Sequence, residues 1–515
     1  MKLTANFSCR FRRIIFLLSL LFLTTFLNLN IFAQTLLAGT GRSNITAKVK
    51  NIHDSLYVKV LLLKDTNTNL AIITLDVVAI GTIGNISDNY YGNIKNKLKN
   101  KFGIEHILVN ASHNHWDGFL EGKNYIVKDV ERRTIEAVKE ALSNLEPVKV
   151  GAGKNSENRI SMNRRVKLQD GTVYTIRHAN PNMPDDEVLG IGKFDPDIGI
   201  LKLDRMDGTS KAVLYNFACH AYAGVFDRGV TAEFPGFASN VIESELGNNT
   251  MAFFLQGFAG DITEILYKNV DDARDCEQFG RMLGLSTLKG IRKIKTSSTA
   301  AISVISKKIE LPLRKDISKI YSRLDKQEKK LLASLRSSSL NMKSFIPLYI
   351  KYKLSPKYPS YYSYRYMQED SLGINGLKMH DIENRRNIKK YLKNMRAMDK
   401  LAQIQENKIF LKRSQSEVDK TGGKTIQAEV EGVRIGNFVV VTFPGEPFAQ
   451  VNFNIKKKSP FKYTFCAGYS NGYIHYAPTA NSYKELGYEV MNTMLAPEWQ
   501  SIYEEKISEI LNQLK

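Results

Sequence analysis

The feature that most constrains the fold is a series of short apolar runs separated by longer amphipathic stretches. Each run ends in polar or turn-forming residues, as strands do, and several intervening stretches carry apolar residues at helical spacing. This alternation predicts an α/β domain with a mixed β-sheet core covered by helices. The predicted strands are 57–63, 70–80, 105–112, 198–203, 212–218, 250–256, 438–443 and 462–468, and the predicted helices are 86–102, 129–145, 234–246 and 275–294.

Composition is compatible with this prediction and excludes two other classes. The chain has 515 residues, of which 43% are hydrophobic and 24% charged, so neither wholesale disorder nor a polytopic membrane protein is expected. Length alone would allow about three domains. Because no Pro-rich or Ser-rich linker and no repeat divides the chain, we predict one main domain over residues 34–515.

The N-terminal segment has the pattern of a targeting signal. Basic residues at positions 2, 10, 12 and 13 precede an apolar stretch that begins at Ile14, and Ala33 offers a small residue for cleavage before Gln34. We therefore predict a signal peptide over residues 1–33 and an exported protein. The alternative is an uncleaved anchor helix, for which an apolar stretch that reaches only Leu29 is marginal.

Positive charge is concentrated in one segment. Of the formal net charge of +21, residues 314–424 supply +15, from 26 Lys and Arg against 11 Asp and Glu. Helical spacing over 315–335 and 382–405 predicts a basic helical insertion. Between these helices, residues 345–366 mix tyrosines with Lys and Arg, a composition that suits an anionic membrane surface or a lipid-like ligand. A solvated helical insertion is the alternative, and nucleic acid is not expected as a partner of an exported chain without a nucleic-acid motif.

Polar side chains of ligand type follow five of the predicted strands. In α/β proteins, residues distant in sequence meet in this way to form a site. The segments are 113–115 after 105–112, 219–220 after 212–218, 257–263 after 250–256, 444–446 after 438–443 and 471–476 after 462–468.

The pair His113 and His115 indicates a metal site. On an extended chain, residues at i and i+2 point to the same side, so both imidazoles could serve one centre. A third imidazole and a carboxylate would complete a zinc site with a position left for water or substrate. Zinc would then activate water and polarise an acyl oxygen, as hydrolysis of an amide or ester requires. No HExxH motif occurs, so a helical zinc-protease site is excluded.

A serine nucleophile is the alternative to a metal centre. Gly468–Gly472 reads GxSxG after a predicted strand, which matches a nucleophile elbow. That motif requires a following helix and then an acid and a histidine. Pro478 follows closely, and His475 is the sole histidine downstream, so we do not predict this mechanism.

Seven segments, taken together and in order, resemble the catalytic domain of the neutral (alkaline, non-lysosomal) ceramidases. They are NASHNHWDG, ISMNRRV, DPDIGILKL, YNFACHA, FLQGFAGDITE, TFPGE and SNGYIHYAPTANSYKELGYE, and they span about residues 38–490. The resemblance implies a zinc-dependent hydrolase that cleaves an N-acyl amide bond, with a lipid-like N-acylated substrate. It also implies zinc ligands at His113, His220, Glu446 and Tyr476, with Tyr473 as the competitor of Tyr476, and a reaction centre lined by His115, Arg164, Tyr488 and Thr263.

This sequence departs from the family pattern at several points. Thr263 stands at the family's serine position and is followed by Glu264 and Ile265 in place of Pro-Asn, and HNHWDG replaces HxHSGP. Threonine keeps a hydroxyl but restricts its side-chain rotation, so Thr263 is expected to be a nucleophile or a positioning hydroxyl. Two alternatives to a ceramidase therefore stay open: a zinc hydrolase of another envelope amide or ester, and a non-catalytic protein that binds a lipid or polymer on the same fold.

Overall fold

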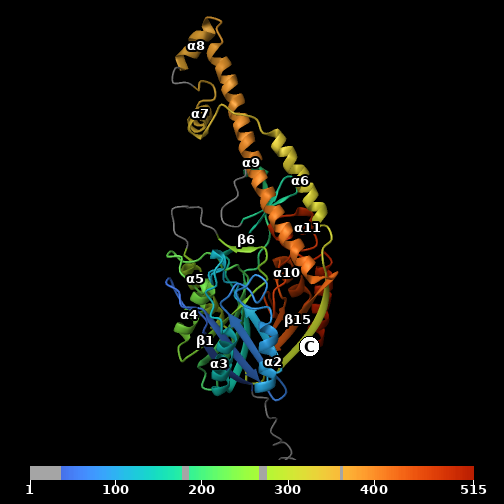
Figure 1. Ribbon diagram of the computed structural model, residues 1–515. Helices are drawn as coiled ribbons and strands as arrows, with labels where there is room; N and C mark the ends of the chain where they lie inside the picture. The colour runs from blue at the N-terminus through green and yellow to red at the C-terminus, as the bar shows by residue number, and fades with distance from the viewer. Residues whose placement is uncertain (1–35, 177–184, 266–274, 360–362) are drawn as a thin grey trace, which may run out of the picture. The chain divides into compact units, whose positions relative to one another are not determined.

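The computed structural model describes residues 36–176, 185–265, 275–359 and 363–515, and it divides into two compact units (Figure 1). The first unit comprises the described residues of Met1–Leu311, Gln427–Glu489 and Pro497–Lys515. The second comprises those of Pro312–Ile426 and Val490–Ala496. The predicted signal peptide, residues 1–33, lies outside the described residues. None of the helices in the described ranges is both long and apolar enough to span a bilayer.

An eight-stranded mixed sheet forms the centre of the first unit. Its order is β12-β11-β10-β5-β1-β2-β3-β4, with parallel pairing between β3 and β4 and between β11 and β12 and antiparallel pairing elsewhere. The strands are β1 (Leu37–Asn44), β2 (Tyr57–Lys64), β3 (Asn69–Leu75), β4 (His106–Ala111), β5 (Glu146–Ser156), β10 (Asp197–Arg205), β11 (Ser210–Phe217) and β12 (Met251–Gln256).

The two faces of this sheet are covered differently. Because side chains alternate along a strand, Val58, Val60 and Leu62 pack under helices, whereas Leu61 and Leu63 pack toward a second sheet. The covering helices are α2 (Tyr90–Phe102), α3 (Val130–Ser143), α4 (Glu233–Leu246) and α5 (Cys276–Ile291). The second sheet has the order β14-β15-β16-β18, formed by β14 (Ile302–Pro312), β15 (Thr425–Ile435), β16 (Phe438–Thr442) and β18 (Tyr463–Ala467).

The predicted α/β class is confirmed, and all eight predicted strands and four predicted helices are present. The strands that were not predicted include β1 and β5, which are rich in glycine and polar residues. In β1 the glycines are required by helix α3: a Cβ on Gly39 or Gly41 would lie about 2 Å from the carbonyl oxygen of Ala141 or Ala137. Close helix packing therefore removed the apolar pattern by which strands are recognised.

The eight-stranded sheet bends so that its two edges approach each other. β1 and β5 pair at only two positions, Leu37 with Pro147 and Ala38 with Glu146. The two edge strands of the sheet, β12 and β4, are also in contact. The backbone N–H of Gln256, at the end of β12, donates to Asn110 Oδ1 of β4 (2.8 Å). The segments that follow β4, β11 and β12 are thereby brought to one place.

The second unit is helical. Its helices are α6 (Ile317–Ser334), α7 (Met342–Leu354), α8 (Ser363–Ser371) and α9 (Gly376–Thr421). Predicted helix 382–405 is the middle of the longer α9, and residues 345–366, for which no helix was predicted, include most of α7 and the start of α8. Within this unit α7 and α8 lie at the N-terminal end of α9, whereas α6 pairs with its C-terminal half through Lys408 and Asp325 (3.0 Å) (Figure 1).

Candidate metal centre and its surroundings

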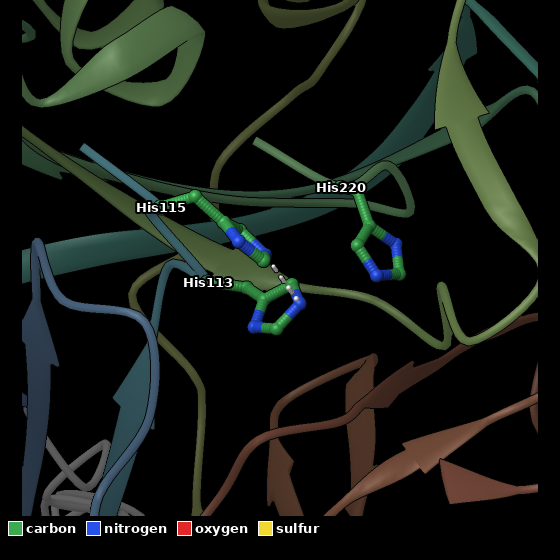
Figure 2. Close-up of side chains that lie close together, drawn as sticks. All are labelled: His113, His115 and His220. Atoms are coloured by element: carbon green, nitrogen blue, oxygen red, sulfur yellow. Dashed lines mark hydrogen bonds between the residues drawn. The ribbon is translucent and has the colours of Figure 1, made fainter. Parts of the chain in front are cut away.

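His113 and His115 follow strand β4, and their ring nitrogens face each other. The two Nε2 atoms are 3.1 Å apart (Figure 2). The prediction that this segment is extended is wrong, because β4 ends at Ala111 and His113 has a φ of +60°. The rings converge for another reason: His113 Nδ1 is fixed on the Val78 carbonyl (2.8 Å), and the His115 amide donates to the Ala221 carbonyl (3.0 Å).

His220 follows strand β11 and completes a group of three imidazoles. Its ring centroid is 4.6 Å from that of His113, and one ligand nitrogen from each of His113, His115 and His220 lies within 4.8 Å of the others. His220 Nδ1 is 2.8 Å from the Ile262 carbonyl oxygen, so this nitrogen carries the proton. The buried Nε2 has no hydrogen-bond partner among the described residues.

Glu446 places a carboxylate beside two of these rings. It lies in the short strand β17 (Glu446–Pro447), where Oε2 is 3.2 Å from His220 Nε2 and 3.7 Å from His113 Nε2. Two tyrosine hydroxyls donate to the carboxylate: Tyr469 to Oε2 at 3.1 Å and Tyr473 to Oε1. The Glu446 side chain is 1% exposed, so these contacts replace its hydration.

These residues fit a divalent metal ion. Because Nδ1 of His113 and of His220 is tied to a backbone carbonyl, the lone pair of each neutral ring is on Nε2, which points toward Glu446. Three imidazoles and a carboxylate are a zinc-type donor set. The buried His220 Nε2 without a hydrogen-bond partner is the kind of atom that a metal ion satisfies.

Burial also keeps the two innermost imidazoles neutral. It lowers the pKa of His113 to about 3, against the opposing effect of Glu446, and it lowers the pKa of His220, with a further contribution from the Arg164 charge. A neutral imidazole is the form that binds a metal ion, so both rings are ready to bind at neutral pH.

The structure places the two competing tyrosines differently. Tyr473 donates its hydroxyl to Glu446, whereas the Tyr476 hydroxyl accepts a hydrogen bond from Arg164 (3.1 Å). Tyr476 is nevertheless the cross-strand neighbour of Glu446, because β19 (Tyr476–Ala477) pairs in parallel with β17 and Glu446 lies opposite Tyr476. Burial raises the pKa of both phenols, and nearby Glu446 raises it further.

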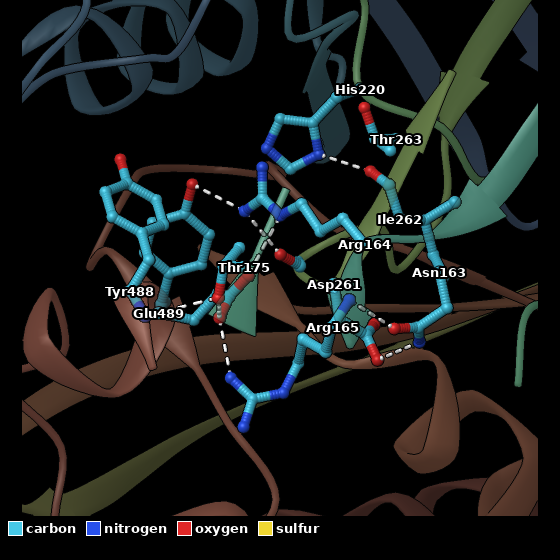
Figure 3. Close-up of polar contacts among 12 residues, drawn as sticks. Asn163, Arg164, Arg165, Thr175, His220, Asp261, Ile262, Thr263, Tyr488 and Glu489 are labelled. Atoms are coloured by element: carbon cyan, nitrogen blue, oxygen red, sulfur yellow. Dashed lines mark hydrogen bonds and ion pairs between the residues drawn. The ribbon is translucent and has the colours of Figure 1, made fainter. Parts of the chain in front are cut away.

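Arg164 is the centre of a buried ion-pair network (Figure 3). It directly follows β6 (Ser161–Asn163), and it donates from Nε to Glu489 (2.9 Å) and from Nη2 to the Gly260 carbonyl (2.8 Å). Arg165 donates to the other oxygen of Glu489 (2.6 Å). The two arginines lower the pKa of Glu489 against the opposing effect of burial, so the carboxylate is charged.

Thr263 and Tyr488 lie on different sides of this network. Thr263, in β13 (Ile262–Glu264), is fully buried and hydrogen-bonds with the Tyr222 hydroxyl; it is also 3.2 Å from Glu264 Oε2. Tyr488 lies edge-on to Tyr476, with ring centroids 5.5 Å apart, and its ring centroid is 5.5 Å from the Arg164 guanidinium carbon. The predicted site residues thus form one connected region of the first unit.

Sequence reasoning missed three residues that support this region. The Tyr469 ring packs against the His113 ring at a tilt of 31°, with centroids 4.1 Å apart, and the Tyr469 hydroxyl donates to Glu446. Glu489 directly follows Tyr488, which was predicted to line the reaction centre, so its position in the sequence could have identified it. Asp117, within the HNHWDG segment, accepts a hydrogen bond from the backbone N–H of Val78 (3.0 Å), the residue whose carbonyl holds His113.

Ser470, the central residue of the GxSxG pattern, has a structural environment. It is fully buried, its hydroxyl donates to the Gly468 carbonyl (3.0 Å), and the Asn110 amide donates to that hydroxyl (3.0 Å). Ser470 therefore joins β4 to the segment after β18.

Two solved structures share this fold. The neutral ceramidase from Pseudomonas aeruginosa matches with a TM-score of 0.57 and 13% identity, over 93% of this chain and 74% of that chain. A structure of a ceramidase complexed with C2 gives 0.57 and 12% identity, over 93% and 75%. No family model and no curated protein matches the sequence. Identities this low show a likeness of fold alone, so the chain has a neutral-ceramidase-like fold.

Proposed function

We propose that this protein is an exported, zinc-dependent hydrolase that cleaves an N-acyl amide bond in a lipid-like substrate of the ceramide type. The observation that carries the proposal is the convergence of His113, His220 and Glu446, with both Nδ1 atoms held by backbone carbonyls and both Nε2 atoms aimed at the carboxylate. The likeness of fold to ceramidases supports the choice of an amide over other acyl bonds.

The metal would be held by His113, His220 and Glu446, with Tyr476 as the fourth ligand. Zinc bound there supplies the Lewis acidity that activates water and polarises an acyl carbonyl. In the described structure the Tyr476 hydroxyl is turned to Arg164, and Tyr473 is the alternative ligand.

The chain's own groups have distinct roles around the reacting bond. His115, which is only partly buried, holds and transfers the proton. Arg164 has Nε and Nη2 fixed by Glu489 and Gly260, and its Nη1 makes no hydrogen bond to the described residues, so Nη1 can donate to an acyl oxygen. Tyr488 lines the same side, and Thr263 is the nucleophile or positioning hydroxyl.

The test measures metal content and hydrolysis together. We expect about one zinc per chain in the protein that begins at Gln34, and release of fatty acid from N-acyl sphingoid lipids. His113→Ala and His220→Ala should lose both, whereas His53→Ala, whose ring pairs with Asp227 at 3.2 Å outside the centre, should keep both. A folded wild-type protein without metal, or a His220→Ala variant of full activity, would contradict the proposal.

A second candidate is a zinc hydrolase of a different acylated or ester-linked molecule. It is favoured by Glu264, a buried carboxylate beside the Thr263 hydroxyl where the ceramidase pattern has proline. A substrate screen separates the two candidates: hydrolysis of short acyl esters with no release from N-acyl sphingoid lipids would favour the second.

A further inference from the structure

Helix α7 of the second unit has apolar side chains on two faces, only one of which is covered. Phe345 and Tyr352 face α9, where the Phe345 ring lies 4.6 Å from the ring of Tyr391. The uncovered face carries an apolar residue at every fourth position, which forms one stripe along the helix. The stripe consists of Met342, Ile346, Ile350 and Leu354, and the last of these is 81% exposed.

Neighbouring parts of the same unit carry further exposed side chains of this kind. Exposed apolar or aromatic side chains occur in α8, in the following loop and in the first turns of α9. They are Tyr364, Met367, Leu372, Ile374, Met379 and Ile382. With the α7 stripe they make ten exposed large apolar side chains within residues 342–382, half of the twenty in the described part of the chain. We call this set the apolar tip. Isolated exposed apolar residues are ordinary, but such a concentration marks an interaction surface.

The apolar tip belongs to an ordered part of the structure. The α7 N-terminus has a capping box between Asn341 and Ser344. The Tyr352 hydroxyl donates to Asp381 of α9 (2.6 Å) and accepts from Asn384 (3.1 Å). Because Phe345 and Tyr352 pack against α9, the helix cannot rotate to bury the stripe, and the stripe stays on its outer face.

Cations lie among the apolar side chains of α7 and of the loop that follows it. Residues 342–358 contain four lysines and no acidic residue. Two of them lie over tyrosine rings, Lys353 over Tyr349 (5.6 Å) and Lys357 over Tyr358 (5.2 Å). Tyrosines and lysines beside exposed aliphatic side chains are the composition of a membrane interface, where rings lie at headgroup level and cations meet phosphates. A second copy of the same surface would bring like charges together.

We propose that the apolar tip docks onto an anionic lipid bilayer, with the aliphatic stripe inserted among the acyl chains and the surrounding lysines against lipid phosphates. Docking of this kind is peripheral, with the stripe reaching the boundary between headgroups and acyl chains. The inference concerns a surface of the second unit and does not require that the first unit be a hydrolase.

Vesicle co-sedimentation tests this inference. The chain that begins at Gln34 is used, because residues 14–29 are themselves apolar. We expect binding to vesicles of phosphatidylcholine mixed with phosphatidylglycerol, and at least tenfold weaker binding to phosphatidylcholine alone. Binding should also weaken as salt rises, because the screening length falls from about 10 Å at 0.1 M to about 3 Å at 1 M.

Substitutions assign the binding to the tip. Ile346→Glu combined with Ile350→Glu should reduce partitioning to the anionic vesicles at least tenfold. Lys351→Gln combined with Lys353→Gln should reduce it about 25-fold at low salt and much less at high salt, since each cation near an anionic surface contributes about fivefold. Ile409→Glu is the matched control, because Ile409 is exposed on α9 outside the tip. It should bind like the wild type.

Three outcomes would overturn the inference. The first is wild-type protein that stays in the supernatant with both kinds of vesicle. The second is an Ile346→Glu, Ile350→Glu variant with unchanged thermal unfolding that binds as well as the wild type. The third is a change from dimer to monomer in that variant without any vesicle binding by the wild type, which would assign the tip to self-association.

Discussion

The first unit buries polar side chains, whereas the second exposes apolar ones. Around the candidate metal centre, Arg164, Glu446 and Glu489 are almost completely removed from water, and each is held by several hydrogen bonds. In the apolar tip, aliphatic side chains such as Leu354 remain in water. Both arrangements oppose folding stability. Proteins keep such unfavourable arrangements where function requires them. The buried charges therefore indicate a functional site in the first unit, and the exposed apolar side chains indicate an interaction surface in the second.

Breaking the buried network should have the largest effect on stability. Glu489→Gln would leave Arg164 and Arg165 buried without their carboxylate, and such a loss costs about 3–5 kcal/mol of unfolding free energy. Urea unfolding followed by circular dichroism measures the change. The control is Glu509→Gln, which breaks an exposed pair with Lys506 and should cost less than about 1 kcal/mol. Equal effects of the two variants would mean that the network is not a structural support.

Removing the carboxylate beside the imidazoles should reduce metal affinity more than stability. We expect Glu446→Gln to bind zinc more than about 100-fold more weakly, because a ligand contributes at least as much as its supporting groups. A chelator competition at neutral pH measures this change. The matched control is Glu429→Gln, which alters a partly exposed ion pair between Glu429 of β15 and Lys95 of α2. Unchanged zinc affinity in Glu446→Gln would remove Glu446 from the ligand set.

A partly buried acid outside the centre should make stability depend on pH. Burial raises the pKa of Asp76 to about 7, so the folded protein keeps a proton between about pH 4 and 7 that the unfolded chain releases. Stability from this group is therefore complete at low pH and is lost as pH rises through that window, by about 1.4 kcal/mol per pH unit. Asp76→Asn, facing a cavity of about 300 Å³, should flatten this dependence. If the unfolding free energy of Asp76→Asn changed with pH as steeply as that of the wild type, the raised pKa of Asp76 would be contradicted.

The smallest effect is expected at the apolar tip. Leu354→Ser should change the free energy of unfolding by less than about 0.5 kcal/mol, because the side chain is already in water. Leu411→Ala, at a fully buried position of α9 in the same unit, should cost about 2–5 kcal/mol. Thermal or urea unfolding distinguishes these values. A large loss in Leu354→Ser would mean that the tip is packed against another part of the protein.

Sequence reasoning predicted the fold class and most of the central strands because their apolar runs are local signals. It also selected His113, His220 and Glu446, since each follows such a run. It did not predict strand β1, where glycine replaces apolar residues under helix α3. It expected an extended chain at His113, whose left-handed φ depends on contacts with Val78 and Ala221. The contacts of Tyr469 with His113 and of Glu489 with Arg164 were missed because the residues of each pair are hundreds of positions apart in the sequence.

The junction between strand β4 and the segment after β18 has a consequence for the order of folding. Asn471 pairs with Val109 from 362 residues further along the chain, through its side-chain oxygen (2.8 Å) and its backbone amide. Contacts of such separation are slow to form, because a long loop must close before they are made. The same separation in sequence means that the three histidines are translated long before Glu446 and the tyrosines beside it. A nascent chain that ends before residue 446 would carry the three histidines without the Glu446 carboxylate, so the proposed metal centre is complete only after residue 446 has been made.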